Sequence, residues 1–149
     1  MILGGGDAAK AARAAAALWE IWHTAGDPAL DALLREGIDA LQRQDTAEAI
    51  AVFTRLIARA PDYAEGWNKR ATARYIAEDY AGAIDDCRET LARKPYHFGA
   101  LSGQGLCHMA LSQFTEAADC FRRTIAVYPQ LDNARTNLRA ALNELVKWN

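Results

Sequence analysis

Apolar, small and proline positions recur along this chain at a fixed spacing of 34 residues. Such a period is typical of a solenoid, in which each unit buries its apolar face only by stacking on its neighbours. The sequence therefore predicts three tandem copies of one structural unit. The positions that keep step are Pro61, Pro95 and Pro129; Leu33, Trp67 and Leu101; Gly37, Ala71 and Gly105; Ala49, Ala83 and Ala117; and Phe53, Cys87 and Phe121.

Each unit contains two helix-length segments that are separated by a short polar turn. We predict first helices at residues 28–43, 63–77 and 97–111, and second helices at residues 46–59, 80–93 and 114–127. The three prolines then fall just past the second helices, where a residue without an amide proton cannot continue a helix. The predicted N-caps are Asp27 before Pro28, Asp45 with Glu48, Asp62 with Glu65, Asp79 alone, and either Gln113 or Ser112.

The flanking segments have the pattern of capping helices. Residues 8–25 are alanine-rich and place Trp19 one period before Phe53, as the second helix of a truncated unit would. After Pro129, an apolar stripe at Leu138, Leu142 and Val146 has helical spacing, with polar residues on the other faces. This last helix can close the stack with a polar outer side.

The 34-residue unit resembles the tetratricopeptide repeat, in which a large apolar residue is followed by a small residue, an alanine, an aromatic and a closing proline. The resemblance covers residues 30–131 and implies an all-α solenoid, a right-handed superhelix of antiparallel helix pairs with about eight helices. Residues 1–7 are expected to be a disordered lead-in and residues 8–149 a single domain. Its expected parts are an N-terminal capping helix at 8–29, repeats at 30–63, 64–97 and 98–131, and a C-terminal capping helix at 132–149.

The segments LWEIWHTAGDPALDALLREG, AEGWNKRATA and HFGALSG also resemble a group of exported bacterial repeat proteins with relatives in plastids. That resemblance implies a periplasmic or exported protein from which a signal peptide has been removed. The alternative is a cytoplasmic protein, because an oxidising compartment would tend to pair the three cysteines.

The chain departs from the family pattern at the seventh, eleventh and twelfth positions of each unit. Polar residues such as Arg70, Arg74 and Gln104 stand where the family usually has apolar ones. The twelfth position is apolar instead, at Leu41, Tyr75 and Met109. Either these three side chains turn partly into the core, or the inner wall of the solenoid is unusually apolar.

Composition narrows the classes of partner. With 17 basic and 19 acidic residues and no basic block, the chain lacks the positive footprint that nucleic acid or anionic lipid requires. No run of residues is long and apolar enough for membrane insertion. The chain has an odd number of cysteines and no CxxC spacing. We therefore expect Cys87, Cys107 and Cys120 to be reduced thiols packed in the core. A chain of this length can fold as a monomer or weak homo-oligomer.

No pattern in the sequence indicates an enzyme, a metal site or a cofactor. The three histidines make no metal-ligand spacing, and Cys107 and His108 are neighbours that point about 100° apart on a helix. Asp85, Asp86 and Glu89 form an acidic cluster that we expect on the solvated outer face. Recurring aromatic residues are expected in the core, whereas Trp148 either covers the edge of the last helix or contacts another chain.

The resemblance implies that the first helix of each unit lines a concave groove. Its inward positions predict a non-catalytic scaffold that binds a peptide or protein segment. A passive inner wall and a self-association module that joins copies through the terminal helices are the alternatives. The predicted groove residues are Leu34, Arg35, Ile38 and Leu41; Glu65, Asn68, Lys69, Thr72 and Tyr75; and Ser102, Leu106 and Met109.

The best-known peptide-binding members of the family hold a C-terminal carboxylate with lysines and asparagines at set inner positions. At those positions this chain has Leu34, Ile38, Lys69, Gly99 and Gly103. The resemblance therefore implies a groove without that carboxylate clamp. The packing of the unit does not require Gly99 and Gly103, and we expect a partner's backbone to approach there.

Overall fold

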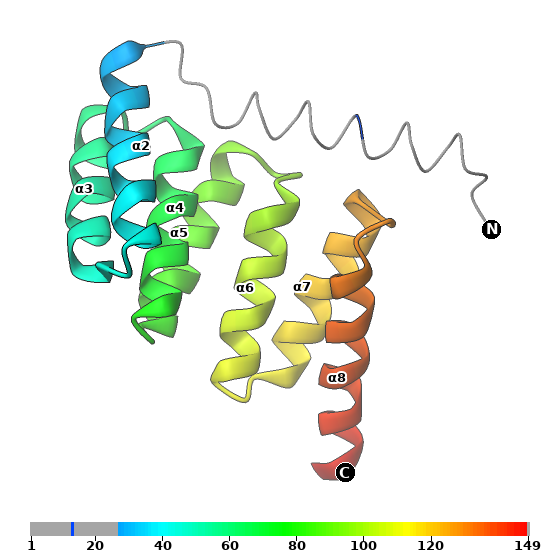
Figure 1. Cartoon of the computed structure of the whole chain (residues 1–149). Helices are drawn as coiled ribbons and strands as arrows, with labels where there is room; N and C mark the ends of the chain where they lie inside the picture. The colour runs from blue at the N-terminus through cyan, green and yellow to red at the C-terminus, as the bar shows by residue number, and fades with distance from the viewer. Residues whose placement is uncertain (1–12, 14–26, 149) are drawn as a thin grey trace.

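The computed structural model describes residue 13 and residues 27–148 (Figure 1). Within this part of the chain all regular structure is helical, and there is no strand. The predicted lead-in, most of the predicted capping helix at 8–29, and Trp19 lie outside the described residues. The helices are α2 (Pro28–Gln42), α3 (Thr46–Arg59), α4 (Ala64–Ile76), α5 (Tyr80–Arg93), α6 (Phe98–Ala110), α7 (Phe114–Val127) and α8 (Asp132–Trp148).

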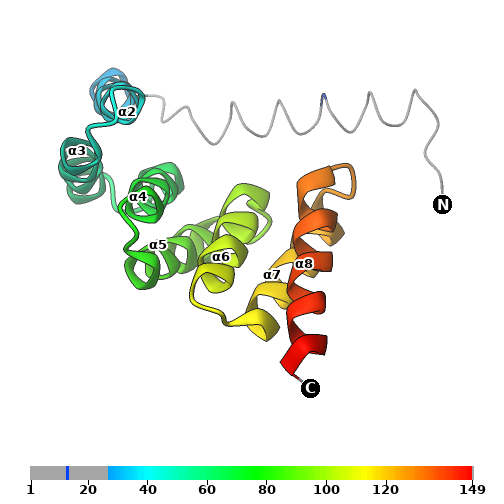
Figure 2. The same ribbon diagram turned by 60° about the horizontal axis from the view of Figure 1, so that its bottom comes forward.

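Consecutive helices pair as antiparallel hairpins that stack side by side, and we call α2–α3, α4–α5 and α6–α7 repeats 1, 2 and 3. In the turned view, α2, α4 and α6 lie along one side of the stack and α3, α5 and α7 along the other, with α8 at the end beside α7 (Figure 2). The first helices also contact one another from repeat to repeat, whereas no comparable contact joins α3 to α5 or α5 to α7. The first helices therefore line the inner, concave face, as the resemblance to the tetratricopeptide repeat implied.

The helix starts match most of the predicted N-caps. Asp27, Asp45 and Asp79 each accept a hydrogen bond from a backbone N–H in the first turn. The prediction for Asp62 is wrong, because Tyr63 is the N-cap of α4 and no side chain caps it. Glu65, its expected reciprocal partner, is instead fully buried in another interaction.

The turn inside each repeat explains why Ser112 is not an N-cap. Gln44, Glu78 and Ser112 occupy the same place in the three repeats and have φ values of 62°, 65° and 57°. Each ends the first helix in the left-handed conformation that closes helix C-termini. Gln113 follows as the N-cap of α7, and no side chain caps that helix.

Repeats 1 and 3 are held together by a phenylalanine that packs on a glycine. Phe53 and Phe121 are fully buried. A methyl group at Gly105 would lie 2.5 Å from the Phe121 ring, and one at Gly37 would overlap the Phe53 ring. In repeat 2 the same two positions are Ala71 and Cys87, so this repeat has a smaller side chain at its centre.

The last helix, α8, packs against α7 and ends the described stack. Val146, the third residue of the predicted apolar stripe, is 75% exposed, so the stripe packs on the core only at Leu138 and Leu142. Ala141 is buried against α7, and Leu138 and Leu142 pack partly on the same core. Arg135 and Arg139 are exposed on the outer side of α8. The side chain of Trp148 lies outside the described residues.

Candidate functional site on the concave face

The predicted groove residues divide into a surface set and a supporting set. Leu34 and Glu65 are buried, so they support the concave face from beneath. Arg35, Thr72 and Tyr75 are exposed. The half-buried members are Ile38, Leu41, Lys69, Ser102, Leu106 and Met109, and Asn68 is buried except for 7% of its surface.

The twelfth positions do not behave alike. Leu41 packs against the core of repeat 1 and Met109 against the core of repeat 3. Tyr75 stays 37% exposed, with its ring edge-to-face against Tyr80. Both possibilities left open by the sequence therefore occur, and the exposed aromatic side chain belongs to repeat 2.

A pocket of about 150 Å³ lies on the concave face between α4 and α6. It unites predicted groove residues of two repeats with the two glycines that packing left unexplained. None of the nine residues that line it is charged. They are Asn68, Ala71, Thr72 and Tyr75 from α4, Cys87 from α5, and Gly99, Gly103, Leu106 and Cys107 from α6.

Small side chains form the floor of this pocket. Cys87 stands where repeats 1 and 3 have a phenylalanine, and it leaves unfilled the space that an aromatic ring would take. A methyl group at Gly103 would meet Cys87 Sγ at 3.8 Å, an ordinary contact distance. Glycine at position 103 is thus not imposed by crowding, unlike glycine at position 105.

A buried polar network fixes one wall of the pocket. Glu65 Oε1 accepts a hydrogen bond of 2.8 Å from Asn68 Nδ2, and Glu65 Oε2 lies 3.0 Å from His97 Nε2. His97 Nδ1 accepts from the Ala100 N–H, so its proton is on Nε2, which donates to Glu65. Both Glu65 and His97 are fully buried, so the network joins repeat 2 to the start of α6 and holds the Asn68 amide in place.

Lys69 lies beside this network. Its Nζ is 3.9 Å from Glu65 Oε1, and its side chain is 15% exposed. Burial lowers the pKa of Lys69, and the Glu65 carboxylate acts in the opposite direction. Lys69 is therefore a partly shielded cation at the edge of the concave face, not a solvated charge.

Behind the pocket, repeat 2 contains a cluster of charges that the sequence did not predict. Asp86 is 2% exposed and accepts hydrogen bonds from Arg70 Nε and Nη2 at 2.9 Å and from Arg74 Nη1 at 3.0 Å. The expected solvated cluster is therefore wrong for Asp86, because two guanidinium groups cover it. Asp85 and Glu89 are exposed, as predicted.

Repeat 3 has neutral polar residues at the corresponding positions. His108 Nδ1 lies 2.7 Å from Gln113 Oε1, and His108 Nε2 lies 3.4 Å from Gln104 Nε2. Gln104 and His108 are buried, and Gln104 Oε1 has no hydrogen-bond partner among the described residues. In repeats 2 and 3 the seventh and eleventh positions thus make polar contacts within the repeat, which explains their departure from the usual apolar pattern.

Comparison with known proteins agrees with this geometry. Two family models, both described as tetratricopeptide repeat, match residues 34–98 and 100–131. These ranges cover repeats 2 and 3 almost completely and repeat 1 from the middle of α2 onward. The chain belongs to the tetratricopeptide repeat family.

The matched curated relatives are longer than this chain. A TPR repeat-containing protein of Rhizobium etli is 32% identical over 110 residues, which cover 72% of this chain and 53% of the relative. Mouse sperm-associated antigen 1 is 27% identical over 74% of this chain and 12% of its own length. The chain thus spans about half of the first relative and a small part of the second.

Solved tetratricopeptide domains share the fold. The first TPR of Spaghetti (RPAP3), bound to the HSP90 peptide SRMEEVD, superimposes with a TM-score of 0.77 at 24% identity, over 78% of this chain and 93% of that one. The Sgt2 TPR domain of Aspergillus fumigatus gives 0.79 at 22% identity, over 83% of each chain. The fold is typically a non-catalytic module with an extended concave surface for protein interaction.

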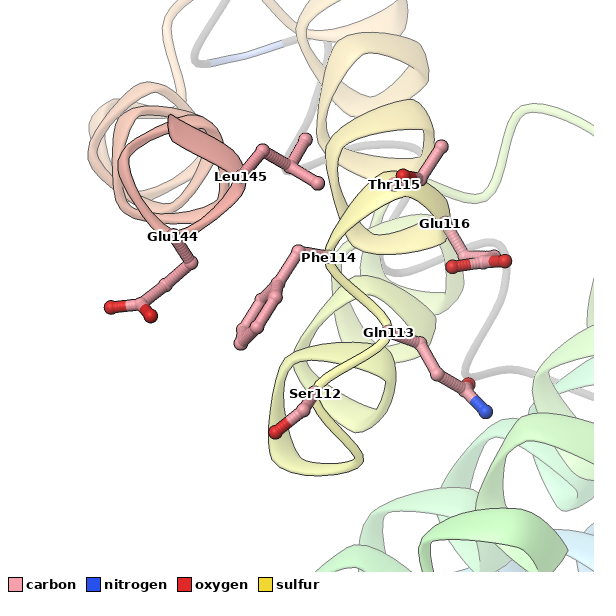
Figure 3. A pocket seen from close by; sticks show the side chains of 7 residues that line it. All are labelled: Ser112, Gln113, Phe114, Thr115, Glu116, Glu144 and Leu145. Atoms are coloured by element: carbon pink, nitrogen blue, oxygen red, sulfur yellow. The ribbon is translucent and has the colours of Figure 1, made fainter. Parts of the chain in front are cut away.

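A second, wider cleft lies at the C-terminal end of the tetratricopeptide stack. It has a volume of about 560 Å³ and lies between the start of α7 and the last turns of α8, away from the α4–α6 pocket (Figure 3). The ring of Phe114 lies between the two helices, with Leu145 and Glu144 across from it. No buried polar group faces this cleft among the residues that line it, which are Ser112, Gln113, Phe114, Thr115, Glu116, Glu144 and Leu145.

The three cysteines are buried with free thiols, as predicted. Burial raises the pKa of Cys107 to about 11 and raises the pKa of Cys87 and Cys120 as well. All three are therefore protonated at neutral pH and have little nucleophilic character.

Among residues 27–148, no group of three histidine, cysteine or acidic side chains is placed to hold a metal ion. No helix of the described part is long and apolar enough to cross a membrane.

Proposed function

We propose that this chain is a non-catalytic scaffold that binds a peptide or protein segment on its concave face. The observation that carries the proposal is the α4–α6 pocket, which joins residues of two repeats on the inner side of the stack. Ligand sites in general combine an apolar cavity with a few fixed polar groups, and here Asn68 supplies such a group. The peptide held by the RPAP3 domain supports this use of the fold.

The segment it binds differs from an acidic chaperone tail. Carboxylate binding would need several accessible cations on the concave face, and the pocket has none. Leu34 is buried, Ile38 is packed on the core, and Lys69 is engaged with Glu65. We expect binding by shape and apolar contact, with weak dependence on salt.

A random peptide library displayed on phage and selected on the immobilised chain tests this function. Enriched peptides are then measured by fluorescence anisotropy against the wild type and two variants, Thr72→Glu on the concave side of α4 and Ala126→Glu on α7. Both positions are exposed, so both variants should fold. We expect Thr72→Glu to weaken binding at least about tenfold because it places a charge at the pocket, and Ala126→Glu to bind as the wild type does.

Two results would contradict the proposal. One is a library that yields no peptide with saturable binding. The other is a set of peptides that bind both variants equally well, because their site would then lie away from the concave face.

A further inference from the structure

We propose that the α4–α6 pocket is a specificity pocket that takes one uncharged, leucine-sized side chain of the bound segment while Asn68 Oδ1 accepts a backbone N–H of the same segment. This inference rests on the proposed function, because it names the side chain that the concave face selects. Its evidence is the volume of the pocket, the chemistry of its lining and the fixed orientation of one amide.

The volume fits a single side chain. The pocket measures about 150 Å³. An apolar cavity of about that size holds a benzene molecule in another protein. A leucine or methionine side chain fits the same space, whereas a tryptophan would have to displace one of the walls.

The lining disfavours a charged occupant. Cys87 and Cys107 form part of the wall, and burial raises the pKa of both thiols, so they are neutral at physiological pH. No lining residue could pair with a carboxylate or an ammonium group. A charged side chain would therefore lose its hydration without compensation.

Asn68 provides one directed polar contact. Its Nδ2 donates to Glu65 Oε1, and a carboxylate oxygen can only accept, so the orientation of the amide is fixed. None of the described residues donates to Asn68 Oδ1, which is left as the atom that this 7% exposed side chain presents to the pocket. A backbone N–H of the bound segment would satisfy it.

Gly99 and Gly103 allow the segment to approach the α6 wall. Both line the pocket one helical turn apart. A methyl group at Gly103 would clash with nothing in the folded chain, so the missing side chain leaves room for an occupant. Glycine in a helix is destabilising relative to alanine, and contact with the backbone of a bound segment would explain why two glycines stand here.

The test uses two minimal probes, N-acetyl-leucine N-methylamide and N-acetyl-aspartate N-methylamide, titrated into the ¹⁵N-labelled full chain. We expect the leucine probe to shift amide resonances of Thr72, Gly103 and Leu106 with saturation. The aspartate probe should bind at least about tenfold more weakly. Equal binding of the two probes, or leucine-probe shifts confined to α3, α5 and α7, would overturn the inference.

Two variants close the pocket by different means. The double variant Ala71→Gly/Cys87→Phe rebuilds in repeat 2 the glycine and phenylalanine that repeats 1 and 3 use, and Gly103→Val fills the opposite wall. The control Ala110→Val adds the same side chain to an exposed position of α6. We expect both closing variants to lose leucine-probe binding at least about tenfold, and the control to retain it. Unchanged affinity in a folded closing variant refutes the pocket.

Library peptides that bind the concave face with full affinity in both closing variants leave the proposed function intact and refute only the pocket. If the leucine probe binds the pocket but the library yields no peptide ligand, the pocket stands and the proposed function is refuted.

Discussion

Repeats 1 and 3 have an aromatic side chain at their centre, whereas repeat 2 has a small thiol and a set of charges. Phe53 and Phe121 fill a glycine notch between the two helices of their repeats. In repeat 2, Cys87 leaves space that opens on the concave face, and the Asp86 cluster joins α4 to α5 instead. The two helices of the middle repeat are thus joined by ion pairs, whereas those of its neighbours are joined by aromatic packing. The apolar lining of the α4–α6 pocket therefore stays accessible to a ligand.

The largest expected effect is the loss of an aromatic centre. Phe53→Ala and Phe121→Ala should each lower the free energy of unfolding by about 3–5 kcal/mol, because each empties a fully buried site. Cys87→Ala in repeat 2 should cost about 1 kcal/mol, since it removes one partly packed atom. Urea denaturation followed by circular dichroism measures all three. Equal losses in the three repeats would abolish the distinction between them.

Removal of the buried carboxylate comes next. Asp86→Ala leaves Arg70 and Arg74 without their shared partner and should cost about 3 kcal/mol. Asp119→Ala is the matched control, because it breaks the exposed Arg122–Asp119 pair and should cost less than about 1 kcal/mol. If the two variants unfold at the same urea concentration, ion pairs do not hold repeat 2 together.

Alkaline pH should destabilise the centre of the stack through its thiols. The folded-state pKa of Cys107 is about 11, above its unfolded value of 9.0, so the folded chain keeps a proton that the unfolded chain releases. This stabilisation is complete below pH 9 and is lost as the pH rises toward 11, by roughly 2 kcal/mol. The pKa of Lys69 is lowered on folding, so its contribution to stability changes in the opposite direction: it rises as the pH increases toward the unfolded value of 10.5.

The Cys107→Ala variant isolates the contribution of the thiol to that pH dependence. Urea denaturation at pH 8, 9, 10 and 11 should show a shallower decline for the variant than for the wild type. Identical slopes would mean that Cys107 titrates in the folded chain as it does in the unfolded chain.

The smallest predicted effect is a gain. The Tyr63 hydroxyl is buried without a hydrogen-bond partner among the described residues, and burial raises its pKa. Tyr63→Phe removes this unsatisfied group from the edge of the repeat 1 core and should stabilise the chain by about 1 kcal/mol. A lower melting temperature in the variant would reveal a hydrogen bond to the hydroxyl in solution.

The helical framework could be predicted from the sequence because it depends on local signals and a period. Proline spacing placed the second helices, and aspartates placed three of the N-caps. The predicted Asp62–Glu65 cap did not form, because Glu65 is buried in contact with Asn68 and His97 instead. The Glu65–His97 contact joins residues 32 positions apart, beyond the reach of a capping pattern.

The polar clusters and the pocket were only partly predictable. The sequence did contain a signal for the Asp86 cluster. The positions equivalent to Asp86 in repeats 1 and 3 are the apolar residues Val52 and Cys120. A single aspartate at a position that is otherwise apolar indicates a buried ion pair. Cys87 in step with two phenylalanines indicated missing volume. Whether that volume opened on the concave face depended on the separation of α4 and α6, which no local pattern encodes.

The most direct test of the account is a chemical-shift map of the full chain bound to the tightest peptide from the display library. The account predicts that the shifted amides cluster on α4 and α6 around the pocket and extend along the inner side of α2. Shifts that centre on α3, α5 and α7, or on the cleft between α7 and α8, would contradict it.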